Sequence, residues 1–379
     1  MITLNPYKDV DFAQCATLVS NTHEHIYNQS TLENCYNRGV RNINLLHYVP
    51  SAPQKFDSNY QVEYEDYISA TDLTKTIKLS PKRSYSDFTD KDGNSVSLSD
   101  IVVVPNCEHV NIKDYSYMLH TNYLGSEFAD PGWSENNGRG ETGLVAWRSA
   151  HPILTDTELF AGVRANMPLG KVFGTFNHPM DGMNGSYNQQ KQFIDNSDGL
   201  IQAMEIFSRG YSSSVNQSFE DCYDYFLNKG YKLWATAVVD WQGDGTQFYP
   251  EDLGANVLLL PSNYSNLTYV QKQNAILDAY IAGQYFPVGI GKLLITNIEE
   301  SGDNVRFTFN KPANAIYCLY DGNKTFVASN TSVVVINTKK ASKYVRIKAL
   351  GDNNDFIFSN PIFVKNNISN TINIFKVLF

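Results

Sequence analysis

The sequence predicts a large α/β domain over residues 1–287, followed by a small all-β domain over residues 288–379. The first observation is a β-type run at 16–20, a helical segment that Gly39 ends, and a second β-type run at 40–47. This order is typical of a βα barrel or a doubly wound sheet, whose functional residues lie at the carboxyl ends of the strands. The second observation is that short β-type runs alternate with Asn and Gly turns from about residue 288, which indicates a β-sandwich.

The hydrophobic pattern predicts the individual elements in turn. Ser30 and Glu33 have the spacing of a capping box, which predicts a helix beginning at residue 30. Residues 50–99 are polar and are predicted to be a long insertion or loop, and 181–190 a shorter loop. The predicted helices are 30–38, 155–166, 219–228 and 266–284. The predicted strands are 16–20, 40–47, 101–104, 117–120, 170–176, 199–207, 232–239, 305–309, 315–320, 332–336 and 344–348.

Composition narrows the class of protein. Hydrophobic residues make up 42% of the 379 residues and aromatic residues 13%, enough for a packed core. A net charge of -9 argues against a nucleic-acid partner, whose phosphates attract basic surfaces. No membrane span and no secretory signal are visible, so we expect a soluble protein, either cytoplasmic or part of a virion or surface assembly. The five cysteines are scattered and are expected to be free thiols.

The histidines are the strongest indication of chemistry. All seven precede residue 179, and four of them end predicted β-runs: His25, His47, His120 and His178. His23 and His25 are two positions apart, so on an extended segment their side chains point to the same side. Glu108 and Asp240 also end predicted β-runs. Imidazoles with carboxylates are typical ligands of zinc, manganese or iron, and the pattern predicts a metal site.

Over residues 18–245 the sequence resembles the PHP (polymerase and histidinol phosphatase) family of metal-dependent phosphoesterases. His23-Glu24-His25 matches the family's HxH motif, and Asn177-His178-Pro179 matches its His-Pro. The tail resembles the Ig-like module that follows many of these enzymes. The remaining matches, in the family's order, are Asn44-Leu45-Leu46-His47, Pro105-Asn106-Cys107-Glu108, Leu119-His120, Glu205 and Asp240.

The resemblance implies an irregular (β/α)7 barrel that binds two divalent metal ions. The first ion would be held by His23, His25, Glu108 and Asp240. The second would be held by Glu108, as a bridge, with His120 and His178. A third site of the family is incomplete, because Gln242 stands where the family has a histidine. His47 is then either a phosphate contact or the remaining ligand of that third site.

The activity that the resemblance implies is hydrolysis of a small phosphorylated or phosphodiester substrate by a metal-bridging hydroxide. Asp240 and His47 are the expected catalytic residues, with His47 placed to protonate the leaving group. Glu205, Arg148 and Gln242 are expected beside the ligands or against the substrate. The C-terminal domain is expected to bind a protein or glycan partner.

Two other functions stay open. One is another metal-dependent hydrolase, such as an amidohydrolase-like enzyme. The other is a binding or structural protein that has kept the barrel and lost turnover, which the incomplete third site favours. His109 competes with His120 as a ligand, but it directly follows Glu108 and should face the opposite side of a strand.

Overall fold

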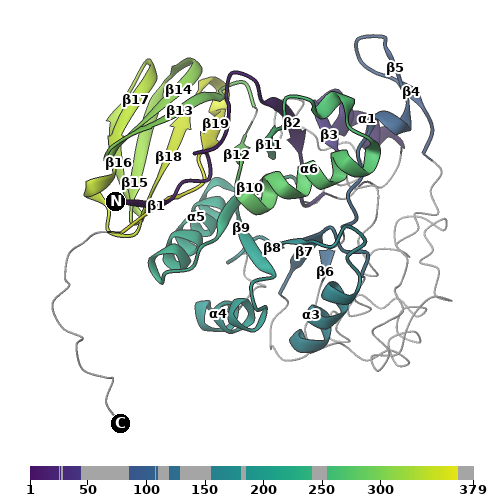
Figure 1. Ribbon diagram of the computed structural model, residues 1–379, viewed down its shortest axis with the longest axis horizontal. Coiled ribbons are helices and arrows are strands. Elements are labelled where there is room, and N and C mark those ends of the chain that lie inside the picture. Colours follow the sequence, from purple (N-terminus) through teal and green to yellow (C-terminus); the bar gives the residue numbers. More distant parts are fainter. Residues whose placement is uncertain are drawn as a thin grey trace.

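The computed structural model describes residues 1–24, 26, 29–43, 85–106, 108–109, 119–128, 155–180, 185–240, 254–289 and 291–365. Over these residues the protein is mixed α/β, with several sheets and with helices packed beside them (Figure 1). The described helices are α1 (Gln29–Asn37), α3 (Asp156–Ala165), α4 (Tyr187–Asn196), α5 (Ser213–Asn228) and α6 (Tyr269–Ala282). Short 3-10 turns are η2 (Leu98–Asp100), η4 (Tyr264–Asn266), η5 (Thr338–Lys340) and η6 (Asp352–Asn354).

One sheet positions most of the residues discussed below. Its described strands run in the order β10 (Trp234–Val238), β9 (Ile201–Ser208), β8 (Phe173–Phe176), β7 (Thr121–Leu124) and β6 (Glu108–His109). Strands β8, β9 and β10 are parallel, whereas β7 is antiparallel to both of its neighbours. The carboxyl ends of β8, β9 and β10 therefore share an edge with the start of β7.

A second sheet joins the two ends of the chain. Its order is β1 (Ile2–Leu4), β20 (Ile362–Val364), β18 (Tyr344–Leu350), β19 (Phe356–Phe358), β12 (Tyr285–Val288), β11 (Ala255–Leu260), β2 (Ala16–Ser20) and β3 (Val40–Asn42). Strand β15 (Ala315–Tyr320) pairs with β18, and β16 (Asn323–Ala328) pairs with β15. The sheet thus runs across the predicted domain boundary at residue 288, since Val288 pairs with Ile357. The Ig-like character of the C-terminal part stays a prediction.

Two smaller sheets complete the described strands. β13 (Ile295–Ser301), β14 (Asn304–Ala313) and β17 (Thr331–Asn337) form one, and β4 (Phe88–Thr89) with β5 (Ser95–Val96) forms a hairpin within the predicted 50–99 insertion. Residues 50–84 lie outside the described residues.

The first two sheets also contact each other beside the histidines, where Glu24, which follows β2, forms a parallel bridge with Asp240, which follows β10. The side chain of Asn256 on β11 bonds to both the N–H and the carbonyl of Ala237 on β10, at 3.1 Å each. These contacts bring the end of β2 to the end of β10. The closed (β/α)7 barrel itself stays a prediction.

Local sequence explains the helix boundaries. Thr155 and Glu158 form a capping box at the start of α3, and Thr268 and Gln271 form one at α6. Gly283 ends α6 with a φ of 72°, a conformation that glycine adopts without steric cost. Helix α1 begins at Gln29, so Ser30 lies inside the helix rather than capping it. Of the predicted strand 101–104, only Val102 makes a β-bridge.

A buried ion pair fastens the C-terminal strands to the rest of the molecule. Arg346 on β18 is fully buried, and its guanidinium bonds to both carboxylate oxygens of Asp224 on α5, at 3.0 and 2.8 Å. The Tyr344 hydroxyl donates to the same carboxylate at 2.8 Å. Figure 1 shows α5 directly beside this group of strands. The pair therefore links elements that are more than a hundred residues apart in the sequence.

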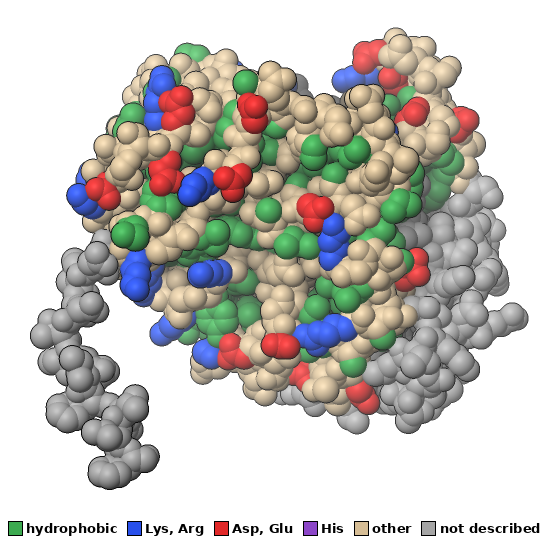
Figure 2. Space-filling view, in the orientation of Figure 1, with side chains coloured by type: hydrophobic (Ala, Val, Ile, Leu, Met, Phe, Trp, Pro, Cys, Tyr) green, Lys and Arg blue, Asp and Glu red, His purple; other side chains and the backbone are tan. Residues whose placement is uncertain are grey.

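The surface carries charges of both signs. Figure 2 shows lysine, arginine and acidic side chains interspersed on the face drawn there, and no described histidine is visible on it. The four described histidines, His23, His109, His120 and His178, are all buried. None of the described helices combines the length and hydrophobicity that crossing a bilayer requires.

Candidate metal centre

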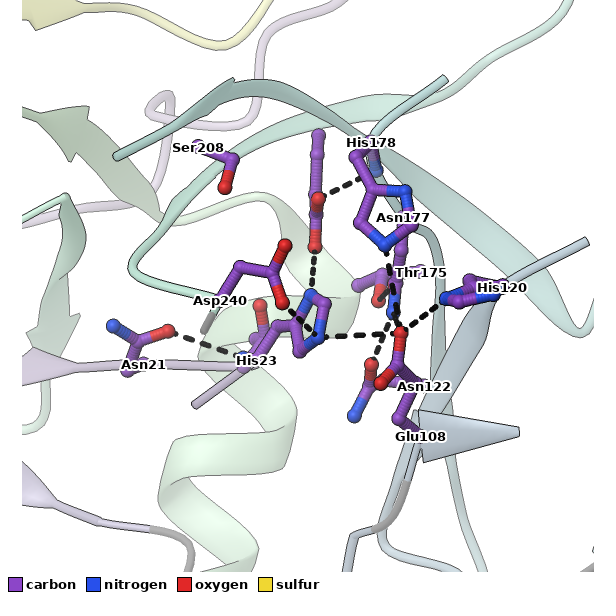
Figure 3. A network of polar contacts seen from close by, with 12 residues as sticks. Asn21, His23, Glu108, His120, Asn122, Thr175, Asn177, His178, Ser208 and Asp240 are labelled. Carbon is purple, nitrogen blue, oxygen red and sulfur yellow. Dashed lines mark hydrogen bonds and ion pairs between the residues drawn. The ribbon is translucent and has the colours of Figure 1, made fainter. Parts of the chain in front are cut away.

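Five of the six predicted metal ligands come together in the structure (Figure 3). Ligand atoms of His23, His178 and Asp240 all lie within 4.8 Å of one another, and so do those of Glu108, His120 and His178. His178 belongs to both groups. Every one of these side chains is buried, with residue exposures between 0% and 8%. Histidine and carboxylate groups in this arrangement could hold a metal ion.

The strand register explains why these side chains meet. Glu108 pairs with Asn122, which in turn pairs with Thr175, so the three lie in a row on one face of the sheet. His178 and Asp240 follow β8 and β10 at the carboxyl edge. His120 and Glu108 were both expected to end strands, which is wrong: His120 precedes β7, and Glu108 begins β6. Because β7 is antiparallel to β8, its start reaches the same edge.

His23 enters from the other sheet. It follows β2, and its carbonyl accepts a hydrogen bond from the Asp240 N–H at 3.0 Å. Its Nε2 lies 3.1 Å from Asp240 Oδ1 and 3.4 Å from Glu108 Oε1. Burial alone would lower the pKa of His23, but the carboxylates of Asp240, Glu108 and Glu205 raise it well above its ordinary value.

Glu108 lies at the centre of the cluster. Its Oε1 is 2.7 Å from His120 Nδ1, 3.4 Å from His23 Nε2 and 3.5 Å from His178 Nε2. Burial would raise the pKa of Glu108, but His23 and His120 hold it well below its usual value. A carboxylate oxygen that faces three imidazoles could share a metal ion with them.

Glu205, expected beside the ligands, contacts two of them at once. Its Oε1 lies 2.8 Å from His23 Nδ1, and its Oε2 accepts a hydrogen bond from the main-chain N–H of His178 at 2.6 Å. A carboxylate on Nδ1 fixes the ring and leaves Nε2 for a metal. His178 and Asp240 have positive φ angles of 21° and 57°, and such strain is common at functional sites. Glu205 thus fixes the backbone at one of these strained residues.

A chain of buried amides supports Glu108, and the sequence reasoning missed it. Asn177 Nδ2 donates to Asn122 Oδ1 and lies 3.5 Å from Glu108 Oε1. Asn122 Nδ2 donates to Asn106 Oδ1 at 3.2 Å, and Asn106 Nδ2 donates to the Thr22 carbonyl at 2.7 Å. The chain connects Glu108 to the backbone next to His23. One feature of the sequence could have indicated this chain of amides: Asn106 and Asn177 belong to the two motifs that contain Glu108 and His178.

His109 lies on the opposite face of β6 from Glu108. Its ring stacks on Phe128 with centroids 5.9 Å apart and meets Tyr123 edge-on at 5.2 Å. Burial lowers the pKa of His109 to about 3, so this imidazole is neutral at neutral pH. His109 is in neither ligand group. Four other predicted site residues, His25, His47, Arg148 and Gln242, lie outside the described residues.

The donor set fits divalent metal ions. Three imidazoles and two carboxylates are buried together, and a further carboxylate, Glu205, is hydrogen-bonded behind one of the imidazoles. Zinc and similar ions bind such mixed sets of nitrogen and oxygen ligands. Buried carboxylates and imidazoles packed this closely cost free energy unless their charges are compensated, and bound cations would compensate them.

Comparison with known proteins adds little to this geometry. No family model and no curated protein matches the chain. Among solved structures, an amidohydrolase from Chromobacterium violaceum, with bound sulfate and no metal, is similar over 38% of this chain and 69% of its own. The two are 14% identical, with a TM-score of 0.26. A likeness this weak says nothing about activity.

Metal affinity is expected to rise with pH near neutrality. The raised pKa of His23 favours the protonated imidazole in the metal-free protein, and a metal ion binds only the neutral ring. Each unit by which the pH falls below that raised pKa should therefore raise the apparent Kd for the metal by about tenfold. Zinc titrations between about pH 6 and pH 8 test this. An affinity that is constant over this range contradicts the assignment of His23.

Replacing Glu205 by glutamine is expected to weaken metal affinity by about 10- to 100-fold, because the amide cannot hold His23 and the His178 N–H in the same way. The measurement is a metal titration of the purified variant. Gln202 offers a matched position, because it lies on the same strand and its side chain donates to the Val172 carbonyl at 3.1 Å rather than to a described ligand. Gln202→Ala should retain the wild-type metal affinity, and a Glu205→Gln variant that does the same would rule out the positioning role.

Proposed function

We propose that the protein is a metal-dependent phosphoesterase acting on a small phosphorylated or phosphodiester substrate. The observation that carries this proposal is that two ligand groups share His178 and have a Glu108 oxygen between their imidazoles. Such an arrangement suits two divalent ions held close together, which is the geometry used for displacement at phosphorus. The family resemblance of the motifs agrees with this reaction.

Each described residue has a role in the proposal. His23 and Asp240 would hold one ion, His120 and His178 would hold the other, and the Glu108 carboxylate would be shared by both. Bound zinc, manganese or iron would lower the pKa of water to about 7 and neutralise charge on the phosphoryl group. His25, outside the described residues, would complete the first set.

The substrate would reach the cluster at its most exposed ligands, Asp240 and His120. Their side chains are 11% and 10% exposed, against 1% for His23, 2% for His178 and 4% for Glu108. The Asp240 carboxylate would accept a hydrogen bond from the attacking water and orient it toward phosphorus. The negative charge of the protein does not oppose this, because the metal ions supply positive charge locally.

The test is an assay of metal-loaded protein on p-nitrophenyl phosphate and bis-p-nitrophenyl phosphate, with manganese or zinc. Metal-dependent release of p-nitrophenol supports the proposal, and the preferred ester distinguishes a monoesterase from a diesterase. Bound metal with no turnover of either ester would favour a binding or structural protein. Metal-dependent cleavage of amides but not phosphoesters would favour another class of hydrolase.

A further inference from the structure

Ser208, the last residue of β9, has a buried hydroxyl without a hydrogen-bond partner among the described residues. Its side chain is 0% exposed, and its Oγ makes no hydrogen bond to any described group. The backbone of Ser208 is fully bonded, since its N–H donates to Asn216 Oδ1 at 2.8 Å and its carbonyl accepts from Asn216 Nδ2 at 3.0 Å. Leaving a buried hydroxyl unbonded costs about 1–3 kcal/mol, so a partner for Ser208 Oγ is to be expected.

A β-bulge turns this hydroxyl toward the cluster. Thr236 on β10 pairs with Glu205, but the next pairs are Ala237 with Phe207 and Val238 with Ser208, so Ile206 is an extra residue on β9. Without it, Ser208 would face the opposite side from Glu205, since they are three positions apart and side chains alternate. With Ile206 as the extra residue, the side chains of Ser208 and Glu205 lie on the same face of the sheet, the face on which Glu205 contacts His23. Bulges near active sites commonly re-aim a side chain in this way.

Ser208 also lies near the carboxyl edge of the sheet, where proposed metal ligands follow their strands. Its partner Val238 is two residues before Asp240, and the Arg209 N–H continues the pairing by donating to the Val238 carbonyl at 3.1 Å. Figure 3 shows the Ser208 side chain near the Asp240 end of the cluster. Thr236 Oγ1 is also buried and unbonded, but it lies deeper in the sheet, level with Glu205. Ser208 thus lies closer than Thr236 to the carboxyl edge of the sheet, where His178 and Asp240 follow their strands.

We propose that Ser208 is a substrate-contacting residue whose hydroxyl donates a hydrogen bond to an oxygen atom of an oxyanion bound at the cluster. This inference rests on the proposed metal centre, which would bring the oxyanion there. A hydroxyl can donate to any acceptor that arrives, and a charged acceptor gives the stronger bond. The expected ligand class is a phosphate or phosphate ester.

Inorganic phosphate, the product of a phosphomonoesterase, is a suitable probe. Calorimetric titration of the zinc-loaded protein should show that Ser208→Ala binds phosphate about tenfold more weakly than the wild type, the effect of losing one hydrogen bond to a charged group. Its metal content should be unchanged. Ser218→Ala is the matched control, because the Ser218 hydroxyl bonds to the Val215 carbonyl within α5 at 2.6 Å, and it should bind phosphate normally.

The outcomes separate this inference from the proposed function. Equal phosphate affinity in Ser208→Ala and wild type, or no phosphate binding by zinc-loaded wild type, overturns the role of Ser208 even if esters are hydrolysed. Weaker phosphate binding by Ser208→Ala without any ester hydrolysis supports the role of Ser208 and rejects catalysis. A protein that takes up no metal overturns both.

Discussion

Replacing His178 by alanine is expected to abolish metal binding and hydrolysis together. His178 is the ligand common to both groups, it is 2% exposed, and its Nε2 lies 3.5 Å from Glu108 Oε1. Its loss removes one of the three ligands from each described group. Because metal ions stabilise the transition state by several kcal/mol, we expect kcat/KM to fall by about a thousandfold or more.

His109 provides the control for this experiment. It is also a buried histidine, but it lies on the opposite face of β6, against Phe128 and Tyr123. His109→Phe should keep the metal content and the hydrolysis of the wild type. The assignment fails if His178→Ala retains both ions, or if His109→Phe loses them while remaining folded by circular dichroism.

The largest effect on stability is expected at the joint between α5 and β18. Asp224→Ala should lower the free energy of unfolding by about 3–5 kcal/mol, because it leaves the fully buried Arg346 guanidinium without its carboxylate. Denaturant titration measures this loss. Metal content should be unaffected in the folded variant, because Asp224 contacts Arg346 and Tyr344 rather than the histidine cluster.

A double variant at the buried ion pair and a single variant at a surface ion pair are the controls for Asp224→Ala. Asp224→Leu with Arg346→Met removes both charges and should recover much of the stability that Asp224→Ala loses. Glu299 and Arg306 form an ion pair at 2.9 Å whose side chains are about half exposed, so Glu299→Ala should cost about 1 kcal/mol or less. If Asp224→Ala costs no more than Glu299→Ala, the buried pair does not fasten the C-terminal strands.

The fold was partly predictable from the sequence, where local signals were strong. Helices α3 and α6 lie within the predicted helices 155–166 and 266–284, and β2 and β10 lie within the predicted strands 16–20 and 232–239. Helix α4 was missed, and its first turn overlaps the end of the predicted loop 181–190, because only Phe193 and Ile194 mark an apolar face among polar residues. The sheet that joins β1 to β20 depends on contacts between chain ends, which no local pattern reports.

The candidate site was predictable where residue type and strand end coincide. His23, Glu108, His178 and Asp240 are of ligand type and stand at the edges of strands, so the sequence alone selects them. Their role as metal ligands stays a prediction. What could not be foreseen is geometry that depends on register. The bulge at Ile206, which turns Ser208 toward the cluster, becomes visible only when β9 is paired with β10. The antiparallel direction of β7 places His120 at the same edge of the sheet as His178.

Metal analysis of protein purified without chelator, by inductively coupled plasma mass spectrometry, tests the central claim most directly. The cluster of His23, Glu108, His120, His178 and Asp240 should carry zinc, manganese or iron. We predict about two divalent ions per chain, retained through dialysis and lost in His178→Ala. Wild-type protein that holds no divalent ion, even after incubation with zinc and manganese, would contradict the account.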